Sequence, residues 1–253
     1  MDSVAATQTI RHGFWRRLTV AGWLLLWPLT FAVWWYPIKT PETRACFVLG
    51  LLGVWAGALL LFWSRRWVRR PLLGLAAIAC ALTLLPGRAV DSNRQRHSYA
   101  RGLLAYRETP YVWGGESPRG IDCSGLIRCG LIDADLKDGV RTLNPRLVRQ
   151  GLSLWWNDCT ANDLKNEWHG QTHFLFAAPS LNTANYGKLL PGDFAVTNSG
   201  VHTLAYLGNQ TWIEAEPNGR WGDKVITVHA PSPDNSWFRL PMHLLRWRQF
   251  EKP

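Results

Sequence analysis

The first third of the chain consists of apolar runs separated by short polar segments. The runs are Leu18–Tyr36, Ala45–Trp63 and Leu72–Pro86. The first two have 19 residues each and are long enough to cross a bilayer as helices, whereas the third has 15 and is marginal. Tryptophans lie at or near their ends, as in the aromatic belts of membrane proteins: Trp34, Trp35, Trp63 and Trp67. This pattern predicts an all-α transmembrane region over residues 1–87, with helices near 18–36, 45–63 and 72–86.

Helical periodicity continues in the more polar sequence that follows. After a polar linker at residues 88–98, the apolar positions from Ser98 to Arg107 recur at the spacing of an amphipathic helix. A second helix is expected directly after Asp122, because leucines and isoleucines recur there at helical spacing. Residues 133–188 hold no period for long. We expect a helix around Pro145–Trp155 and, elsewhere in this segment, a surface elaboration that forms one wall of a cleft.

From Leu190 on, short alternating runs bounded by turn residues predict the strands of an antiparallel sheet. The runs are Asp193–Thr197, His202–Leu207, Thr211–Ala215, Val225–His229 and Leu244–Phe250. Turn residues such as Asn198-Ser199-Gly200 and Gly208-Asn209 separate them. Residues 88–253 therefore read as one α+β domain, with helices first and sheet second.

Charge is distributed unevenly along the chain. Residues 1–87 contain 9 Lys or Arg and 2 Asp or Glu, while residues 88–253 contain 19 and 16. The basic excess therefore flanks the apolar runs, which indicates a membrane and argues against a nucleic-acid partner. Arginines between the second and third runs would stay cytoplasmic: Arg65, Arg66, Arg69 and Arg70. With three spans, the anchor would lie in the cell inner membrane and the C-terminal domain would face the periplasm.

Two alternatives bear on this topology. The first run follows several arginines, as a cleaved signal peptide does, but no small-x-small site follows it and a second apolar run comes soon after. The third run is short and is followed by further arginines, among them Arg88 and Arg94. If the third run does not cross the bilayer, the domain is cytoplasmic.

The stretch from Tyr111 to Gly125 places a cysteine where a glycine-rich loop becomes a helix. A free thiol is mostly protonated at neutral pH, and a helix N-terminus favours the thiolate. The orphan N–H groups of the first helical turn could also hold an oxyanion. Cys123 is therefore a candidate nucleophile, although a cysteine on a helix is more often buried packing.

A histidine and a carboxylate on neighbouring strands could serve this thiol. His202 opens one predicted strand, and Glu214 lies in the next strand of a tight hairpin through Gly208-Asn209. Residues near these two positions can lie side by side on the sheet, so the carboxylate could hold the imidazole tautomer and favour imidazolium.

Other cysteines and histidines carry weaker signals. Cys129 and Cys159 could form a disulfide in an oxidising compartment, but their spacing does not establish it. Cys159, His169 and His173 lack the Cys-x2-Cys half and the fourth ligand of a zinc site. We therefore predict no metal and no cofactor.

Four linked motifs resemble those of the NlpC/P60 cysteine peptidases. They are Tyr111-Val-Trp-Gly-Gly with Asp122-Cys-Ser-Gly125, Leu190-Pro-Gly-Asp193, Val201-His202 with Tyr206-Leu-Gly208, and Trp212-Ile-Glu-Ala215. They occur in the expected order between about Ser98 and Phe250. The resemblance implies a papain-like fold and the hydrolysis of amide bonds in peptidoglycan stem peptides, commonly next to D-glutamyl residues.

The resemblance also implies roles for single residues. Cys123 corresponds to the nucleophile, His202 to the base and Glu214 to a third polar residue. Tyr111 matches a tyrosine near the oxyanion site. Two further residues match positions that contact the amino end of the substrate: Asp122 and Ser124.

The sequence departs from the family pattern in three ways. The third polar residue is more often His, Asn or Gln than Glu, the segment before Pro191 is longer than expected, and three membrane spans are not a family hallmark.

Three alternative functions compete with a peptidase. They are an acyltransferase or amidase acting on lipid or small amides, a non-catalytic membrane-tethered cell-wall-binding module, and a toxin delivered to rival cells. The intact set of Cys123, His202 and Glu214 argues against the non-catalytic module. The order of cysteine before histidine, the Asp122-Cys-Ser-Gly125 motif and a periplasmic location favour a peptidase, with a peptidoglycan peptide as substrate and membrane lipid as its surroundings. The oligomeric state is not defined by the sequence.

Overall fold

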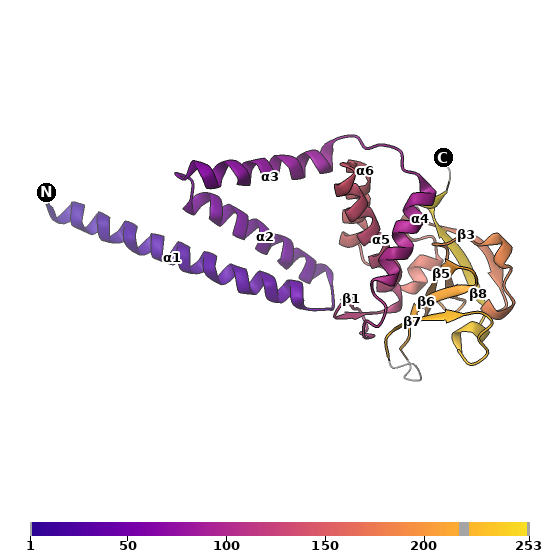
Figure 1. The fold of residues 1–253 in the computed structure, drawn as a ribbon. Coiled ribbons are helices and arrows are strands. Elements are labelled where there is room, and N and C mark those ends of the chain that lie inside the picture. The colour runs from indigo at the N-terminus through magenta and orange to yellow at the C-terminus, as the bar shows by residue number, and fades with distance from the viewer. Residues whose placement is uncertain (1, 218–222, 252–253) are drawn as a thin grey trace. The chain divides into compact units, whose positions relative to one another are not determined.

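The computed structural model describes residues 2–217 and 223–251, with side chains from residue 16 onward, and it divides into two compact units (Figure 1). One unit comprises residues up to 36 together with 40–81. The other comprises residues 37–39 and those from 82 onward. The first is entirely helical, whereas the second contains both helices and strands.

The first unit is built from apolar helices. α1 spans Asp2–Trp35, α2 spans Pro41–Leu61 and α3 spans Arg66–Leu84, with its last turn counted in the second unit. Each contains a stretch long and apolar enough to cross a membrane. The third helix begins at Arg66, before the predicted start at Leu72, and so reaches 19 residues. The expectation of a marginal third segment was therefore wrong in length.

Small residues let α1 and α2 approach each other closely. A Cβ atom on Gly57 would lie 2.2 Å from the Trp23 ring, and one on Gly50 would lie 2.4 Å from Thr30 Oγ1. Trp23 Nε1 donates a hydrogen bond to the carbonyl of Val54 at 2.8 Å, which links the two helices. Close packing at small residues is the usual way in which helices associate where no water drives them together.

The second unit begins with four helices, α4 (Ser92–Leu104), α5 (Cys123–Arg141), α6 (Pro145–Trp156) and α7 (Ala161–Lys165). The predicted helix at residues 145–155 is confirmed by α6. α4 begins at Ser92, not Ser98, because Asp91 caps its first turn by accepting from the backbone N–H groups of Asn93 and Arg94. The buried residues at its start, Gln95 and Arg96, are polar, so apolar spacing does not reveal these first turns.

The predicted antiparallel sheet is confirmed and has six strands. They are β3 (Thr172–Ala178), β4 (Phe194–Thr197), β5 (Thr203–Gly208), β6 (Thr211–Ala215), β7 (Val225–His229) and β8 (Met242–Trp247), in the order β3-β8-β4-β5-β6-β7. β3 was not predicted. The last strand ends at Trp247, and residues Arg248–Phe250 form a 3-10 turn where the strand had been expected to continue.

Short elements complete this unit. A two-stranded ribbon, β1 (Glu116–Ser117) with β2 (Gly120–Ile121), precedes α5. The remaining 3-10 turns are Trp168–Gly170, Leu181–Thr183, Tyr186–Lys188 and Trp237–Arg239.

The sheet has an apolar core on each face. On one face, buried α5 residues such as Leu126 and Ile127 pack with Phe194 and Ile213. The other face is covered by the 3-10 segments, and Trp212 is fully buried among their residues. Because α5 packs on β5 and β6, its N-terminal residue is brought close to these two strands.

A buried ion cluster ties the sheet to α4. Asp193, which is 0% exposed, accepts from Arg96 at 3.2 Å and from two nitrogens of Arg246 at 2.7 Å each. Its other bond is to the backbone N–H of Leu190. The preceding Gly192 has φ +91 and lies against Phe250, so this turn needs glycine. The aspartate of the Leu-Pro-Gly-Asp motif is therefore structural.

Asp193→Asn is expected to destabilise the chain by about 3–5 kcal/mol, because it leaves the buried guanidinium of Arg96 without a counter-charge. Thermal unfolding of the full chain in mild detergent, followed by near-UV circular dichroism, measures the effect. Asp133→Asn is the control, since its ion pair with Lys137 is largely exposed and is worth at most about 1 kcal/mol. Equal midpoints for the two variants would refute the importance of the cluster.

Candidate active site

The start of α5 is fixed by Asp122. This residue is the N-cap, and its Oδ1 accepts from the backbone N–H of Gly125 at 2.6 Å and from Ser124 Oγ at 3.0 Å. Its Oδ2 accepts from the N–H of Gly114 at 2.8 Å, which ties the glycine loop to the helix. Cys123 is therefore the first residue of α5, as predicted, and its side chain is held where the backbone N–H groups are unpaired within the helix.

A buried histidine–carboxylate pair lies next to this thiol. His202 Nε2 is 2.7 Å from Glu214 Oε2, and the two side chains are 1% and 0% exposed. His202 immediately precedes β5 and does not open the strand as predicted. The pairing of Ala205 with Ile213 sets the register that brings His202 diagonally opposite Glu214 of β6. Cys123 Sγ lies 3.9 Å from the carbonyl of Val201, the residue before His202. The structure thus brings together the three residues predicted for catalysis.

The environment of His202 favours its charged form. Burial alone lowers the pKa of an imidazole, but hydrogen bonds and charge interactions with Cys123 and Glu214 outweigh it and raise the pKa to about 10. Because Nε2 is engaged by Glu214, Nδ1 is the nitrogen left for the thiol. The arrangement places an imidazolium beside the thiol, which is the neighbour that activates a cysteine nucleophile.

Sequence reasoning missed two residues that hold this pair. Asn235 is 2% exposed, and its Nδ2 donates to Glu214 Oε1 at 2.5 Å. The ring of Trp237 stacks on His202 at 4.1 Å between centroids and 19° between planes. Its indole N–H donates to Glu216 at 3.0 Å, and its backbone N–H donates to Asn235 Oδ1. Both residues lie in the loop between β7 and β8, where no period or motif marks them.

The remaining predicted site residues are Tyr111, Asp122 and Ser124. Burial, together with the negative charges of Cys123 and Asp122, raises the pKa of Tyr111 above its usual value, so the phenol stays protonated and able to donate. Asp122 and Ser124 are engaged with each other and with the loop. Asp122 is accounted for as the N-cap of α5 and Ser124 as a donor to its carboxylate. A contact of either residue with substrate stays a prediction.

Asn235→Ala is expected to lower kcat by about 10- to 100-fold with little change in KM, because a hydrogen bond to a charged group is worth roughly 1.5–3 kcal/mol. Steady-state kinetics of amide hydrolysis separate the two parameters. Ser236→Ala is the matched control, since this exposed neighbour makes no side-chain cap hydrogen bond. A wild-type kcat for Asn235→Ala would show that Asn235 does not position Glu214.

The structure contains neither the disulfide nor the zinc site that the sequence had left open, within the residues it describes. All five cysteines are free, and burial raises the pKa of Cys159 to about 12. Over the described ranges, 2–217 and 223–251, no group of three or more His, Cys, Asp or Glu residues could hold a metal ion. A depression of about 390 Å³ on α6 contains none of the predicted site residues.

The second unit is thus an α+β domain with a thiol at a helix N-terminus facing a histidine–carboxylate pair. Residues 108–227 match the model of the NlpC/P60 family. The chain therefore contains an NlpC/P60 family domain. Asn235 and Trp237 lie beyond the matched segment.

Individual relatives share less than 30% sequence identity with this chain, and most of them align over only part of their own length. The chain is 29% identical over 109 residues to dipeptidyl-peptidase 6 of Lysinibacillus sphaericus, which covers 39% of this chain and 38% of that protein. NlpC1 from Trichomonas vaginalis aligns with a TM-score of 0.39 and 18% identity over 64% of this chain and 46% of its own. The NlpC/p60 domain of the peptidoglycan hydrolase SagA aligns with a TM-score of 0.32 and 23% identity, over 61% of this chain and 98% of its own.

Proposed function

We propose that this protein is a membrane-anchored cysteine peptidase that hydrolyses amide bonds in peptidoglycan stem peptides. One observation carries the proposal: the Cys123 thiol stands at the N-terminus of α5 beside the buried pair of His202 and Glu214. This is the arrangement that activates a thiol for attack on a carbonyl carbon. The peptidoglycan substrate is inferred from membership of the family.

The reaction follows from the geometry. The Cys123 thiolate attacks the amide carbon, and the carbonyl oxygen gains negative charge near the first N–H groups of α5 and the phenol of Tyr111. The imidazolium of His202 protonates the leaving amine, and a thioester to Cys123 remains. His202 then takes a proton from water, which attacks the thioester and releases the acid. The carboxylate of Glu214 stabilises the imidazolium through its hydrogen bond to His202.

The loop that joins α1 and α2 indicates on which side of the membrane the catalytic domain lies. Residues 37–39 belong to the second unit: the Glu116 N–H donates to the Pro37 carbonyl at 3.0 Å, and Ile38 pairs with Gly115. If α1 and α2 cross the bilayer, this loop and the catalytic domain lie on the same side, which requires α3 to cross as well. With Arg65 and the arginines of the first turns of α3 in the cytoplasm, we place the domain, from about residue 88 to residue 253, in the periplasm of a bacterium.

Digestion of purified peptidoglycan tests the proposal. The full chain in mild detergent is incubated with the polymer beside Cys123→Ala, and soluble products are resolved by mass. New stem-peptide fragments from the wild type alone support the peptidase and identify the bond. If neither folded protein releases fragments, lipid or small-amide substrates and then a wall-binding module take its place.

A further inference from the structure

One face of the domain, formed by α6 and the residues before it, is both basic and apolar. Residues 139–157 contain no Asp or Glu and include Arg141, Arg146 and Arg149. The exposed positions of α6 recur at helical spacing, with Arg146 and Arg149 followed by Leu152 and Trp156, which are 39% and 51% exposed. An exposed helical stripe of arginines, leucine and tryptophan is typical of helices that lie in a membrane interface.

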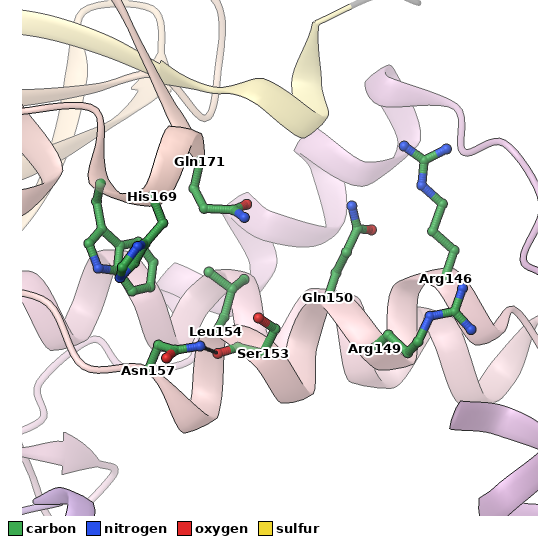
Figure 2. Close-up of a pocket in the computed structure, with 9 residues that line it drawn as sticks. Arg146, Arg149, Gln150, Ser153, Leu154, Asn157, His169 and Gln171 are labelled. Atoms are coloured by element: carbon green, nitrogen blue, oxygen red, sulfur yellow. Dashed lines mark hydrogen bonds between the residues drawn. The ribbon is translucent and has the colours of Figure 1, made fainter. Parts of the chain in front are cut away.

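The arginines of this stripe line a polar cavity of about 390 Å³ (Figure 2). Figure 2 shows Arg146, Arg149 and Gln150 projecting from α6, with Gln171 across from them. No carboxylate is among the residues that line it. Within the described part of the chain, Arg146 makes no side-chain hydrogen bond or ion pair, so its guanidinium is available to an outside anion. Phosphate esters have the charge and the acceptor oxygens that this set of donors can bind.

The stripe lies next to the chain as it leaves the third apolar helix. Arg149 Nη1 donates to the carbonyl of Leu85 at 2.6 Å and to that of Thr83 at 3.2 Å. Asn144 exchanges hydrogen bonds with the backbone of Arg88, at 3.1 and 3.2 Å. Leu85 itself is 54% exposed. Within the second unit, residues 83–88 are thus hydrogen-bonded to α6 and to its N-cap.

The loop that joins α1 and α2 is connected to the other end of α6. Residues 37–39 pair with the loop at 114–116, beside Trp113, which is 78% exposed. Arg128 connects this loop to the end of α6, since its guanidinium binds the Glu116 carboxylate and donates to the Asn157 carbonyl at 2.8 Å. The segment after α3 is therefore bonded near the start of α6, and the loop between α1 and α2 is connected to its end. We name the exposed residues that lie along α6 and beside these attachments the α6 face: Trp113, Arg146, Arg149, Leu152 and Trp156.

We propose that the α6 face lies on the bilayer surface, with Arg146 and Arg149 bound to the phosphates of anionic phospholipid headgroups. The inference rests on the proposed membrane attachment and adds the orientation of the domain. Trp113, Leu152 and Trp156 occupy the boundary between headgroups and acyl chains, where such side chains are favoured. The domain is held against the membrane by its own surface as well as by its helices.

Spin labels on the full chain test this orientation. Single cysteines replace Leu152, Leu240 and Leu49 in a background of Cys46→Ser, Cys80→Ser and Cys123→Ala. The chains are reconstituted in phosphatidylcholine vesicles with 30% phosphatidylglycerol, and access to oxygen is compared with access to a water-soluble nickel chelate. Leu152 and Leu240 are matched controls for each other, since each is 39% exposed, whereas Leu49 lies in α2 and reports the anchor.

The expected result is that labels at positions 49 and 152 are shielded from nickel and accessible to oxygen, while the label at position 240 is not. Equal nickel access at positions 152 and 240, with position 49 shielded, would show that the α6 face does not lie on the bilayer, and would leave the membrane attachment intact. Nickel access at position 49 would overturn the membrane attachment itself. A label at position 152 that stays in water and is immobilised by added wall polysaccharide would assign the face to a glycan instead.

Charge reversal separates headgroup binding from apolar burial. Arg146→Glu in the protein labelled at position 152 should raise nickel access in vesicles with phosphatidylglycerol. Arg239→Glu, at another exposed arginine, should not. Unchanged access with Arg146→Glu would overturn the role of the headgroup phosphates.

Discussion

Replacement of Cys123 by alanine is expected to abolish hydrolysis, lowering kcat/KM for a stem-peptide amide by at least about 10⁴-fold. The thiol lies at the first turn of α5 and beside His202, and without it no thioester forms. Release of product from an isolated stem peptide, followed by mass spectrometry, measures the loss. Circular dichroism establishes that the variant is folded.

Cys129→Ala is the matched control for this variant. Cys129 lies on the same helix and is 6% exposed, against 5% for Cys123, but its sulfur donates to the carbonyl of Glu116 instead. The control should keep near wild-type activity. Equal loss in both variants would mean that a cavity in the core under α5, and not the nucleophile, accounts for the effect.

Glu214→Gln is expected to lower kcat/KM at least about a hundredfold at neutral pH. The carboxylate accepts from two donors, Nε2 of His202 and Nδ2 of Asn235, at 2.7 and 2.5 Å. A glutamine has one acceptor oxygen, so one of the two donors would face an NH₂ group inside the core. The loss of negative charge also removes part of what stabilises the imidazolium.

The same substitution should move the alkaline limb of the pH–rate profile to lower pH. In the wild type, Cys123 and Glu214 raise the pKa of His202 to about 10, so the imidazolium persists through neutrality and is lost as the pH rises through that value. Removing the carboxylate lowers the pKa, and the imidazolium is then lost at a lower pH. Glu167→Gln is the control, because Glu167 forms an exposed ion pair with Arg248 and contacts neither residue of the pair. An unmoved limb in Glu214→Gln would assign the raised pKa to Cys123 alone.

Much of the fold could be predicted because its elements are locally periodic. The helix after Asp122 and the strands from Phe194 to His229 each carry their own apolar pattern and turn residues. β3 escaped prediction because it is an edge strand with a register shift between Phe174 and Phe176, so its burial does not alternate. The start of α4 escaped because a cap and polar residues, not apolar spacing, define it.

In the candidate site, too, the residues that could be predicted are those with a local signal in the sequence. Cys123 is marked by glycines and a helix start, and the pair of His202 and Glu214 by a two-strand hairpin. Asn235 comes 21 residues after Glu214 in an irregular loop, and only the folded chain brings it to the carboxylate. The N-capping role of Asp122 could have been predicted from its place before a helical pattern, since aspartate is a favoured cap.

The α6 face shows why the long segment before the sheet was hard to interpret from its sequence. The segment was expected to be a surface elaboration apart from one helix, yet Trp168 is buried while Trp156 is exposed on α6. The stripe of α6 becomes meaningful only when Leu85 and Arg149 are seen to be in contact. That contact joins two parts of the chain whose sequence patterns are unrelated.

The most direct test of the central claim is covalent labelling by a stem-peptide analogue that carries a chloromethyl ketone in place of the scissile amide. A thiolate displaces chloride and forms a stable thioether, which peptide mapping by mass locates. We predict a single adduct on Cys123, slowed by excess stem peptide and by Glu214→Gln. Adducts spread over Cys46, Cys80 and Cys123 without competition from the peptide would contradict the claim that Cys123 is the nucleophile of a stem-peptide hydrolase.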